Sequence, residues 1–143
     1  IIFSMNPTYE TYWGGPDKMY RKRLGDHYIK TNMFREIIDQ GVCLTGGSDS
    51  DVTEYNPMIG VSAAVNHPVK QHQISVYEAL EMYTCKSAYA IFAEKEKGTL
   101  EVGKIADIVV LDQDILSVPH DLLDQVKVIV TIKSGDILYN TLG

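Results

Sequence analysis

The spacing of apolar residues divides this chain into an α/β part and a carboxyl-terminal part built mainly from strands. Short apolar runs rich in β-forming residues predict buried strands, and apolar residues three or four positions apart predict helices. The pattern predicts strands over residues 1–5, 42–45, 108–111, 126–132 and 137–139, helices over 32–40, 58–66 and from 75 onward, and a loop or short helix over 118–125. Ser75 and Glu78 have the spacing of a capping box, and the helix that they begin ends near Thr84 or continues to Phe92.

The predicted strand over 126–132 places alternate apolar side chains on one face. These side chains are Val126, Val128, Val130 and Ile132. Ser134-Gly135 predicts a tight turn, after which Ile137-Leu138-Tyr139 returns as the second arm of a hairpin. We expect the carboxyl third of the chain to form a small sheet.

Three aromatic residues follow the first predicted strand. Asn6-Pro7 ends that strand, and Gly14-Gly15-Pro16 is a strong breaker cluster, so we expect a loop between them. Aromatic side chains beyond a strand end are suited to line a substrate pocket, and they can equally pack a loop onto its neighbours. Both interpretations of Tyr9, Tyr12 and Trp13 stay open at this point, and Trp13 is a candidate substrate contact.

Two carboxylates, Asp49 and Asp51, come directly after the second predicted strand and the glycines Gly46 and Gly47. In a barrel of parallel strands, residues just beyond the carboxyl ends of strands lie at the mouth of the active site. The alternative is a simple turn, because Ser and Asp side chains often hydrogen-bond to their own backbone and cap the next segment. The pattern alone favours the turn.

Composition and charge narrow the classes of function. The chain has 143 residues, which is enough for one domain with a core, and 45% of them are hydrophobic. A net charge of -6 disfavours a nucleic-acid or anionic-membrane partner, and no apolar run approaches the roughly 18 residues of a membrane span. No Gly-x-Gly-x-x-Gly or P-loop sequence is present, so nothing supports a nucleotide-dependent oxidoreductase or similar α/β module.

The two cysteines bear on the cellular compartment of the protein, and the first residues bear on the length of the parent chain. Cys43 and Cys85 have no disulfide-framework spacing, and we expect buried free thiols, which fit a reducing compartment and a cytoplasmic location. The chain opens with Ile1-Ile2-Phe3-Ser4-Met5, in the middle of a strand pattern and with no initiator methionine. We therefore expect it to be the carboxyl-terminal portion of a longer protein.

A set of short motifs in a fixed order resembles the carboxyl-terminal part of a metal-dependent amidohydrolase. The motifs are Gly47-Ser48-Asp49, Asn56-Pro57, Glu78-Ala79-Leu80 with Thr84, Ala88-Tyr89-Ala90, and the run from Gly98 to Asp112. The run from Gly98 to Asp112 is the most specific of them, and the resemblance extends from about Ser4 to Tyr139. The sequence is most similar to the branch that includes the N-substituted formamide deformylases.

This resemblance implies a fold of class α/β in two parts. Residues 1–93 would supply the last strands and helices of a (β/α)₈ barrel, with 1–5 as its seventh strand and 42–45 as its eighth. Residues 94–143 would supply the carboxyl-terminal strands of a small β-sandwich. Asp49 falls where the family has its eighth-strand aspartate, which helps to hold a divalent metal, most often zinc, and takes the proton from the metal-bound water.

The sequence also departs from the family. Family members commonly have proline where this chain has Asp51, so the second carboxylate either contacts the substrate or caps a turn. The family's His-x-His pair and its middle-strand ligands have no counterpart here. His67 and His72 flank a proline-containing loop with poor ligand geometry, and His27 and His120 stand alone as expected surface residues. One aspartate does not make a metal site, so we expect no tightly bound metal in this chain alone.

The implied function is hydrolysis of a non-peptide carbon–nitrogen bond in a small amide or cyclic amide. The chain alone is expected to be inactive, and to self-associate or to bind the amino-terminal part of the same protein through unpaired strand edges and bare apolar faces, such as that of the strand over 126–132. The alternative is a non-catalytic domain of the same fold that serves assembly or binding. An upstream His-x-His pair would favour the enzyme.

Overall fold

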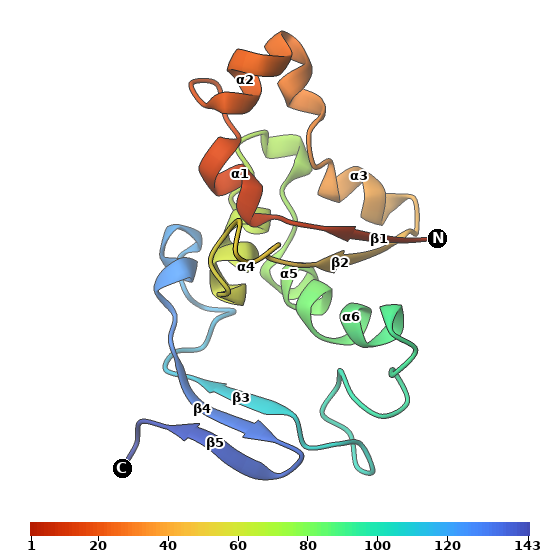
Figure 1. The fold of residues 1–143 in the computed structure, drawn as a ribbon, viewed down its shortest axis with the longest axis vertical. Helices are drawn as coiled ribbons and strands as arrows, with labels where there is room; N and C mark the ends of the chain where they lie inside the picture. Colours follow the sequence, from red (N-terminus) through yellow and green to blue (C-terminus); the bar gives the residue numbers. More distant parts are fainter.

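The structure of this chain is a computed structural model that describes residues 1–143, and it is mixed α/β with two separate sheets (Figure 1). In chain order its elements are β1 (Ile2–Met5), α1 (Thr8–Trp13), α2 (Met19–Leu24), the 3₁₀ helix η1 (Gly25–Lys30), α3 (Phe34–Asp39), β2 (Cys43–Gly46), α4 (Pro57–Val65), η2 (Lys70–His72), α5 (Val76–Tyr83), α6 (Cys85–Ala90), β3 (Ile108–Leu111), η3 (His120–Gln125), β4 (Val128–Lys133) and β5 (Asp136–Asn140). All five strands predicted from the sequence are present.

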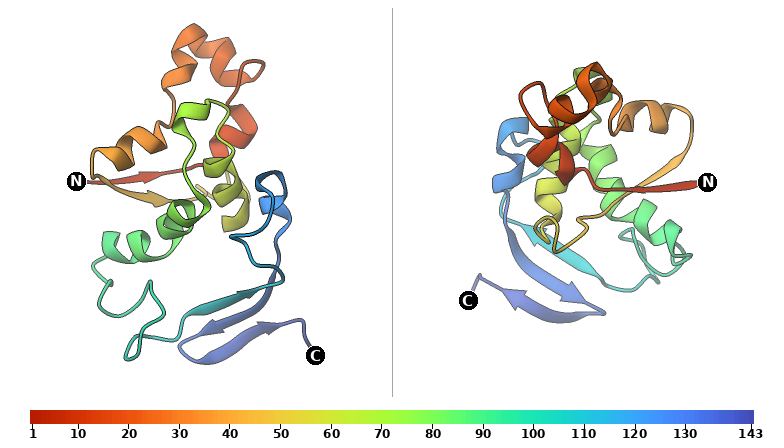
Figure 2. Two further views of the ribbon diagram at one scale, coloured as in Figure 1. Left: turned by 180° about the vertical axis from the view of Figure 1, so that it is seen from behind. Right: turned by 45° about the horizontal axis from the view of Figure 1, so that its top comes forward.

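The first sheet has two parallel strands, β1 and β2. They pair in register, with Ile2 opposite Cys43 and Met5 opposite Gly46. Parallel strands need a long crossover, which α1, α2, η1 and α3 supply here. Helix α3 lies on one side of this pair and helices α5 and α6 lie on the other, as the views in Figures 1 and 2 agree. Each strand has one partner, so its outer edge is unpaired.

The second sheet is antiparallel, with the order β3-β4-β5. Strands β4 and β5 form the predicted hairpin, and Ser134 and Gly135 at its turn have positive φ angles of 53° and 90°. Glycine reaches such angles without strain, which suits the tight turn between strands of a hairpin. This sheet lies apart from the helices at the carboxyl-terminal end of the molecule (Figure 2).

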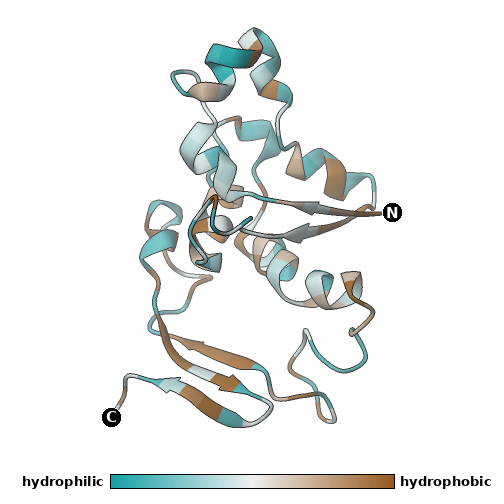
Figure 3. Ribbon diagram, in the orientation of Figure 1, coloured by the Kyte–Doolittle hydropathy of each residue, from teal (hydrophilic) through white to brown (hydrophobic).

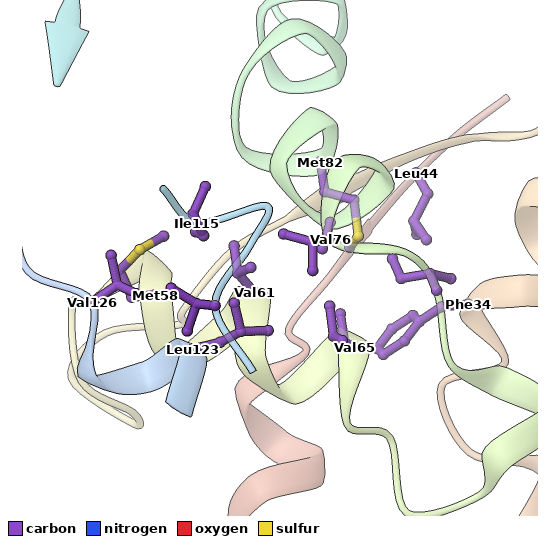
Figure 4. Packing of buried hydrophobic residues seen from close by; sticks show 14 residues of the cluster. Phe34, Leu44, Met58, Val61, Val65, Val76, Met82, Ile115, Leu123 and Val126 are labelled. Carbon is purple, nitrogen blue, oxygen red and sulfur yellow. The ribbon is translucent and has the colours of Figure 1, made fainter. Parts of the chain in front are cut away.

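Helix α4 lies at the centre of the single hydrophobic core (Figure 4). It is apolar on nearly all sides, and it begins at Asn56, whose side chain accepts a hydrogen bond of 3.0 Å from the Met58 N–H. The segment around η3 packs against it, and Asn66 Nδ2 donates to the His120 carbonyl at 2.7 Å. Ile115 and Leu123 share the core cluster with Phe34 and Leu44, so residues on both sides of the expected boundary at 93/94 contribute to it. The division into two domains stays a prediction.

The helix that begins at Ser75 ends at Thr84. The capping box is present in full, because the Glu78 N–H donates to Ser75 Oγ and the Ser75 N–H donates to Glu78 Oε2 at 2.9 Å. Thr84 has φ -123° and ψ -99°, which breaks the helix, and α6 starts at Cys85. Of the two ends that the sequence left open, the structure has the earlier one.

The segment after β1 was expected as a loop, and this expectation is wrong. Residues Thr8–Trp13 form helix α1. Pro7 has φ -57°, which is already helical, and proline suits the first turn of a helix because it has no N–H to leave unpaired. The breaker cluster that starts at Gly14 ends helix α1, but it does not prevent residues 8–13 from forming a helix.

The expectation that the strand over 126–132 has a bare apolar face also needs correction. Val126 and Val130 are buried, and Val128 and Ile132 are half-buried. Val126, which lies just before β4, belongs to the core cluster together with Leu123. The exposed apolar residues of this sheet lie mostly on β5 instead, whose Ile137 and Leu138 are 62% and 64% exposed. Figure 3 shows the apolar character of all three strands.

The cysteines are free thiols, as expected, but Cys43 and Cys85 are half-buried, where full burial was expected. His27 and His120 are exposed, as expected. Residues 19–30 form the largely exposed α2 and η1. No helix of this structure combines the length and the apolar character that a membrane span requires.

The Tyr83 ring fits between two glycines, Gly46 of β2 and Gly60 of α4. A Cβ on Gly46 would lie 2.5 Å from Tyr83 Cζ, and one on Gly60 would lie within the contact radius of the Tyr83 hydroxyl. We predict that Gly60→Ala lowers the free energy of unfolding by about 1–3 kcal/mol, as overpacking does. This loss exceeds the helix-propensity gain of about 1 kcal/mol that alanine brings.

Urea denaturation measures this difference. The matched test is the double variant Gly60→Ala/Tyr83→Phe, which lacks the hydroxyl that the new methyl group would meet. It should lose less stability than the two single variants added together. A Gly60→Ala chain as stable as the parent would contradict the packing described here.

Candidate functional site

The candidate site begins where β2 ends at two glycines. The Gly47 N–H donates to the Met5 carbonyl at 2.8 Å, which carries the pairing of the two strands one residue past Gly46. A Cβ on Gly47 would lie 3.0 Å from Asn6 Oδ1, and Gly46 lies against the Tyr83 ring. A side chain at Gly46 would collide with Tyr83, and one at Gly47 would press on Asn6, so the two glycines allow β2 to pass close to both α5 and the end of β1.

Asp49 lies in a tight turn just beyond these glycines. Its φ of 52° is in the left-handed region, which aspartate tolerates better than most residues because its side chain is short and polar. The Val52 N–H donates to the Asp49 carbonyl at 2.7 Å, and Thr53 Oγ1 donates to the Ser48 carbonyl. The turn therefore fixes the backbone of Asp49 and leaves its side chain exposed.

Two tyrosines of α1 bind this acidic loop. The Tyr9 hydroxyl donates to Asp49 Oδ2, and the Tyr12 hydroxyl donates to Glu54 Oε2. Residues three apart share one face of a helix, so this face of α1 contacts the loop at two points. Each carboxylate raises the pKa of the tyrosine that binds it, mainly because the hydrogen bond that the hydroxyl donates stabilises the protonated form of the tyrosine.

Trp13 and Asp51, the two candidate substrate contacts, line one hollow of about 600 Å³. Its walls are Tyr12, Trp13 and residues 50–55. The Trp13 ring also packs against Tyr9, with 4.5 Å between the ring centroids, and against Tyr12 at 6.3 Å. The aromatic residues after β1 therefore do both things that the sequence left open, since they line a hollow and pack the segment together. Asp51 also accepts a hydrogen bond of 3.2 Å from Ser50 Oγ.

The opposite side of α1 carries a buried carboxylate, that of Glu10. Glu10 is 3% exposed, and its Oε1 accepts a hydrogen bond of 2.6 Å from Asn32 Nδ2. Its Oε2 lies 3.6 Å from Nε2 of His67, which is 1% exposed. Burial alone would raise the pKa of Glu10, but the contacts with His67 and Asn32 outweigh it and hold the pKa below its usual range.

His67 and His72 are core residues. The His67 ring packs edge-to-face on Phe34 and on His72, with centroids 5.5 Å and 5.3 Å apart. His67 Nδ1 accepts from the Val69 N–H at 3.0 Å, and His72 Nε2 donates to the Ile29 carbonyl at 2.7 Å. Both rings are enclosed, as their 1% and 2% exposure shows, although the sequence placed them in a polar loop.

A divalent metal normally takes at least three protein ligands. The structure contains no group of three or more histidine, cysteine or acidic side chains arranged to hold an ion. The residues of this chain do not form a complete metal centre by themselves. The Asp49 carboxylate is exposed and can supply one oxygen ligand, because Tyr9 binds only Oδ2 and leaves Oδ1 available.

Sequence reasoning missed Glu10 and the contact between Tyr9 and Asp49. The contact joins residues 40 positions apart, so no local pattern indicates it. A signal for the helix itself was present: Pro7 at the start of the segment and the four-residue spacing of Tyr9 and Trp13 both suit helix α1.

Comparison with known proteins gives a consistent set of relatives. Residues 3–139 match the sequence model of the Amidohydrolase family. The amidohydrolase YtcJ of Bacillus subtilis is 30% identical over 82% of this chain and 24% of its own length. The N-substituted formamide deformylase of Arthrobacter pascens is 30% identical over 96% of this chain and 27% of its own length.

Solved structures agree with these relatives. An uncharacterized metal-dependent hydrolase from Pyrococcus horikoshii superposes with a TM-score of 0.70 and 26% identity, over 85% of this chain and 26% of its own. The chain thus spans about a quarter of the length of the relatives that it matches. The resemblance noted in the sequence is confirmed.

We predict that Glu10 makes the stability of the fold acid-sensitive. A carboxyl whose pKa is lowered on folding stabilises the fold above its unfolded value of 4.5, and this contribution is lost as the pH falls through the folded pKa. Glu10→Gln should lower the free energy of unfolding by about 2 kcal/mol at neutral pH, since hydrogen bonds to a charged group are lost. It should also flatten the dependence of stability on pH below about pH 4.5.

Thermal melts between pH 3 and pH 7 measure both effects. Glu36→Gln is the matched control, because Glu36 is an exposed carboxylate on α3. It should follow the parent at every pH. A Glu10→Gln chain with the acid sensitivity of the parent would contradict this account of Glu10.

Proposed function

Because this chain belongs to the amidohydrolase family, we propose that it forms the carboxyl-terminal portion of a metal-dependent hydrolase of non-peptide carbon–nitrogen bonds. The substrate would be a small amide or cyclic amide. The single observation that carries this proposal is the placement of Asp49, whose exposed carboxylate follows the carboxyl end of a parallel strand and is hydrogen-bonded by Tyr9. Carboxyl ends of parallel strands carry the active site in barrel enzymes of this architecture.

The same proposal assigns each part of the fold. Strands β1 and β2 would be the seventh and eighth strands of a (β/α)₈ barrel, and α5 and α6 would close it, within a barrel part that covers residues 1–93. Residues 94–143 would contribute β3, β4 and β5 to a small β-sandwich. The parallel pairing of β1 with β2 and the separate antiparallel sheet support this assignment.

Asp49 has two roles in this proposal. It would hold a divalent metal, for which we propose zinc, together with ligands from outside this chain. When bound, such an ion polarises the carbonyl of an amide and makes water easier to deprotonate. The Asp49 carboxylate would accept the proton and would then pass it to the leaving nitrogen.

The hollow beside Asp49 suggests where the substrate would lie. Trp13 presents an apolar aromatic surface, and Asp51 presents a carboxylate on the same hollow. We propose that these two residues contact the part of the substrate beyond the scissile bond. Two free thiols and the absence of a disulfide support a cytoplasmic location for the enzyme.

We predict that Asp49→Asn in the full-length protein lowers kcat for amide hydrolysis by about 100- to 10,000-fold or removes it, because an amide cannot accept the proton. Asp51→Ala is the matched control, since it removes a carboxylate two residues away on the same loop. It should change KM or stability modestly. Turnover of an amide panel, with circular dichroism to verify folding, tests both variants.

Near-normal turnover by Asp49→Asn would overturn the assignment. A loss in Asp51→Ala as complete as that in Asp49→Asn would show that the essential carboxylate is Asp51.

We also predict that the 143-residue chain self-associates, or stays bound to the amino-terminal part of the same protein. The outer edges of β1 and β2 carry unpaired N–H and C=O groups, and β5 exposes Ile137 and Leu138. Unpaired edges and apolar patches recruit other chains. Light scattering coupled to size exclusion should give a mass well above 16.0 kDa at micromolar concentration.

A charged residue in the exposed apolar patch supplies the matched variant. Leu138→Lys should reduce the association without unfolding the chain, because Leu138 is 64% exposed. A clean 16.0 kDa monomer with cooperative unfolding in the parent chain would end this proposal.

A further inference from the structure

Helix α1 contacts the acidic loop with one face and the core with another. We propose that Tyr9 of this helix is a positioning residue, which holds the Asp49 carboxylate in the orientation that metal binding and proton transfer require. This inference rests on the proposed function of Asp49. It adds a residue from a different segment, 40 positions away in the chain, to the machinery of the site.

The loop side of the contact shows why Asp49 needs a partner. Its backbone is fixed by the turn, but its side chain is exposed and would rotate freely about its own bonds. The Tyr9 hydroxyl donates to Oδ2 and so selects one orientation of the carboxylate. Carboxylates that ligate metals are themselves commonly hydrogen-bonded, and these outer partners set the direction of the ligand.

The helix side shows that the Tyr9 hydroxyl is itself held in place. Thr8 and Glu10, the neighbours of Tyr9, are 1% and 3% exposed, so both are anchored in the interior. Glu10 binds Asn32 at 2.6 Å and faces His67 at 3.6 Å. The Tyr9 ring also packs against Trp13. Because α1 is anchored in the interior, the Tyr9 hydroxyl has a fixed position, and its hydrogen bond restricts the orientation of the exposed Asp49 carboxylate.

The chain offers a matched comparison for this role. Tyr12 lies on the same face of α1 and also donates to a carboxylate of the loop, but its partner is Glu54. Removal of either hydroxyl deletes one hydrogen bond between α1 and the loop and leaves the aromatic ring. Only the Tyr9 hydroxyl acts on Asp49, so the two variants separate positioning of Asp49 from general support of the loop.

The experiment uses Tyr9→Phe, Tyr12→Phe and Asp49→Asn in the full-length protein. It measures the zinc dissociation constant by competition with a chromophoric chelator, together with kcat, KM and the melting temperature. Tyr9→Phe should bind zinc about 10- to 100-fold more weakly, as the loss of an outer partner of a ligand does, and kcat should fall by a similar factor. KM should stay within about twofold of the parent value, because the ring that packs on Trp13 is kept.

Tyr12→Phe should leave zinc affinity within about twofold of the parent, and because Tyr12 lines the hollow proposed for the substrate, any kinetic effect of this variant should appear in KM. Equal effects of Tyr9→Phe and Tyr12→Phe, or a fall in the melting temperature of Tyr9→Phe large enough to account for its losses, would overturn the inference and leave the role of Asp49 intact. Failure of the proposed function looks different, because Asp49→Asn would then keep both turnover and zinc affinity.

Discussion

The burial of helix α4 is the constraint on which the rest of this structure depends. Its residues are apolar on nearly every side, so other elements must cover it all round. Helix α5, the segment around η3 and helix α1 supply this cover. The carboxyl-terminal part of the chain is attached to the rest largely through this requirement, since Ile115 and Leu123 complete the core around α4.

Helix α4 also fixes one end of the loop that carries the candidate site. The loop that carries Asp49 leaves the sheet at Gly46 and ends at Asn56, which caps α4. Both ends of the loop are therefore attached to the core, one through strand pairing and one through a helix cap. The polar contacts of α1 add two further attachments between these ends, at Asp49 and Glu54. The exposed loop is therefore held by contacts at four residues, which are Gly46, Asp49, Glu54 and Asn56.

Local sequence signals predicted the elements and missed most of the contacts between them. The capping box at Ser75, the strands and the hairpin turn at Ser134-Gly135 depend on residues close together in the chain, so the sequence alone indicated them. Helix α1 was missed because the glycines after it were taken to mark the whole segment as a loop. The face of residues 126–132 that was expected to be bare is partly covered, and Val126 joins the core cluster with Leu123, which no spacing of residues along the strand reveals.

The site shows the same division. The ordered motifs from Gly47 to Asp112 predicted the family, and the family assignment is confirmed. The contacts of Asp49 with Tyr9, and of Glu10 with Asn32 and His67, join segments 40, 22 and 57 positions apart. Such pairs follow from the packing of α1 against the core and the loop. Recognising them requires the folded arrangement.

Trp13 has a consequence for observation of this chain in solution. It is the only tryptophan in the sequence, and the rings of Tyr9, Tyr12 and Tyr20 lie 4.5, 6.3 and 6.5 Å from it. Light absorbed by these tyrosines reaches the indole by energy transfer, whose efficiency falls steeply with separation. The fluorescence of the chain therefore comes mainly from the one place where α1 meets the acidic loop. A change in tryptophan emission would therefore indicate that α1 and the acidic loop have separated.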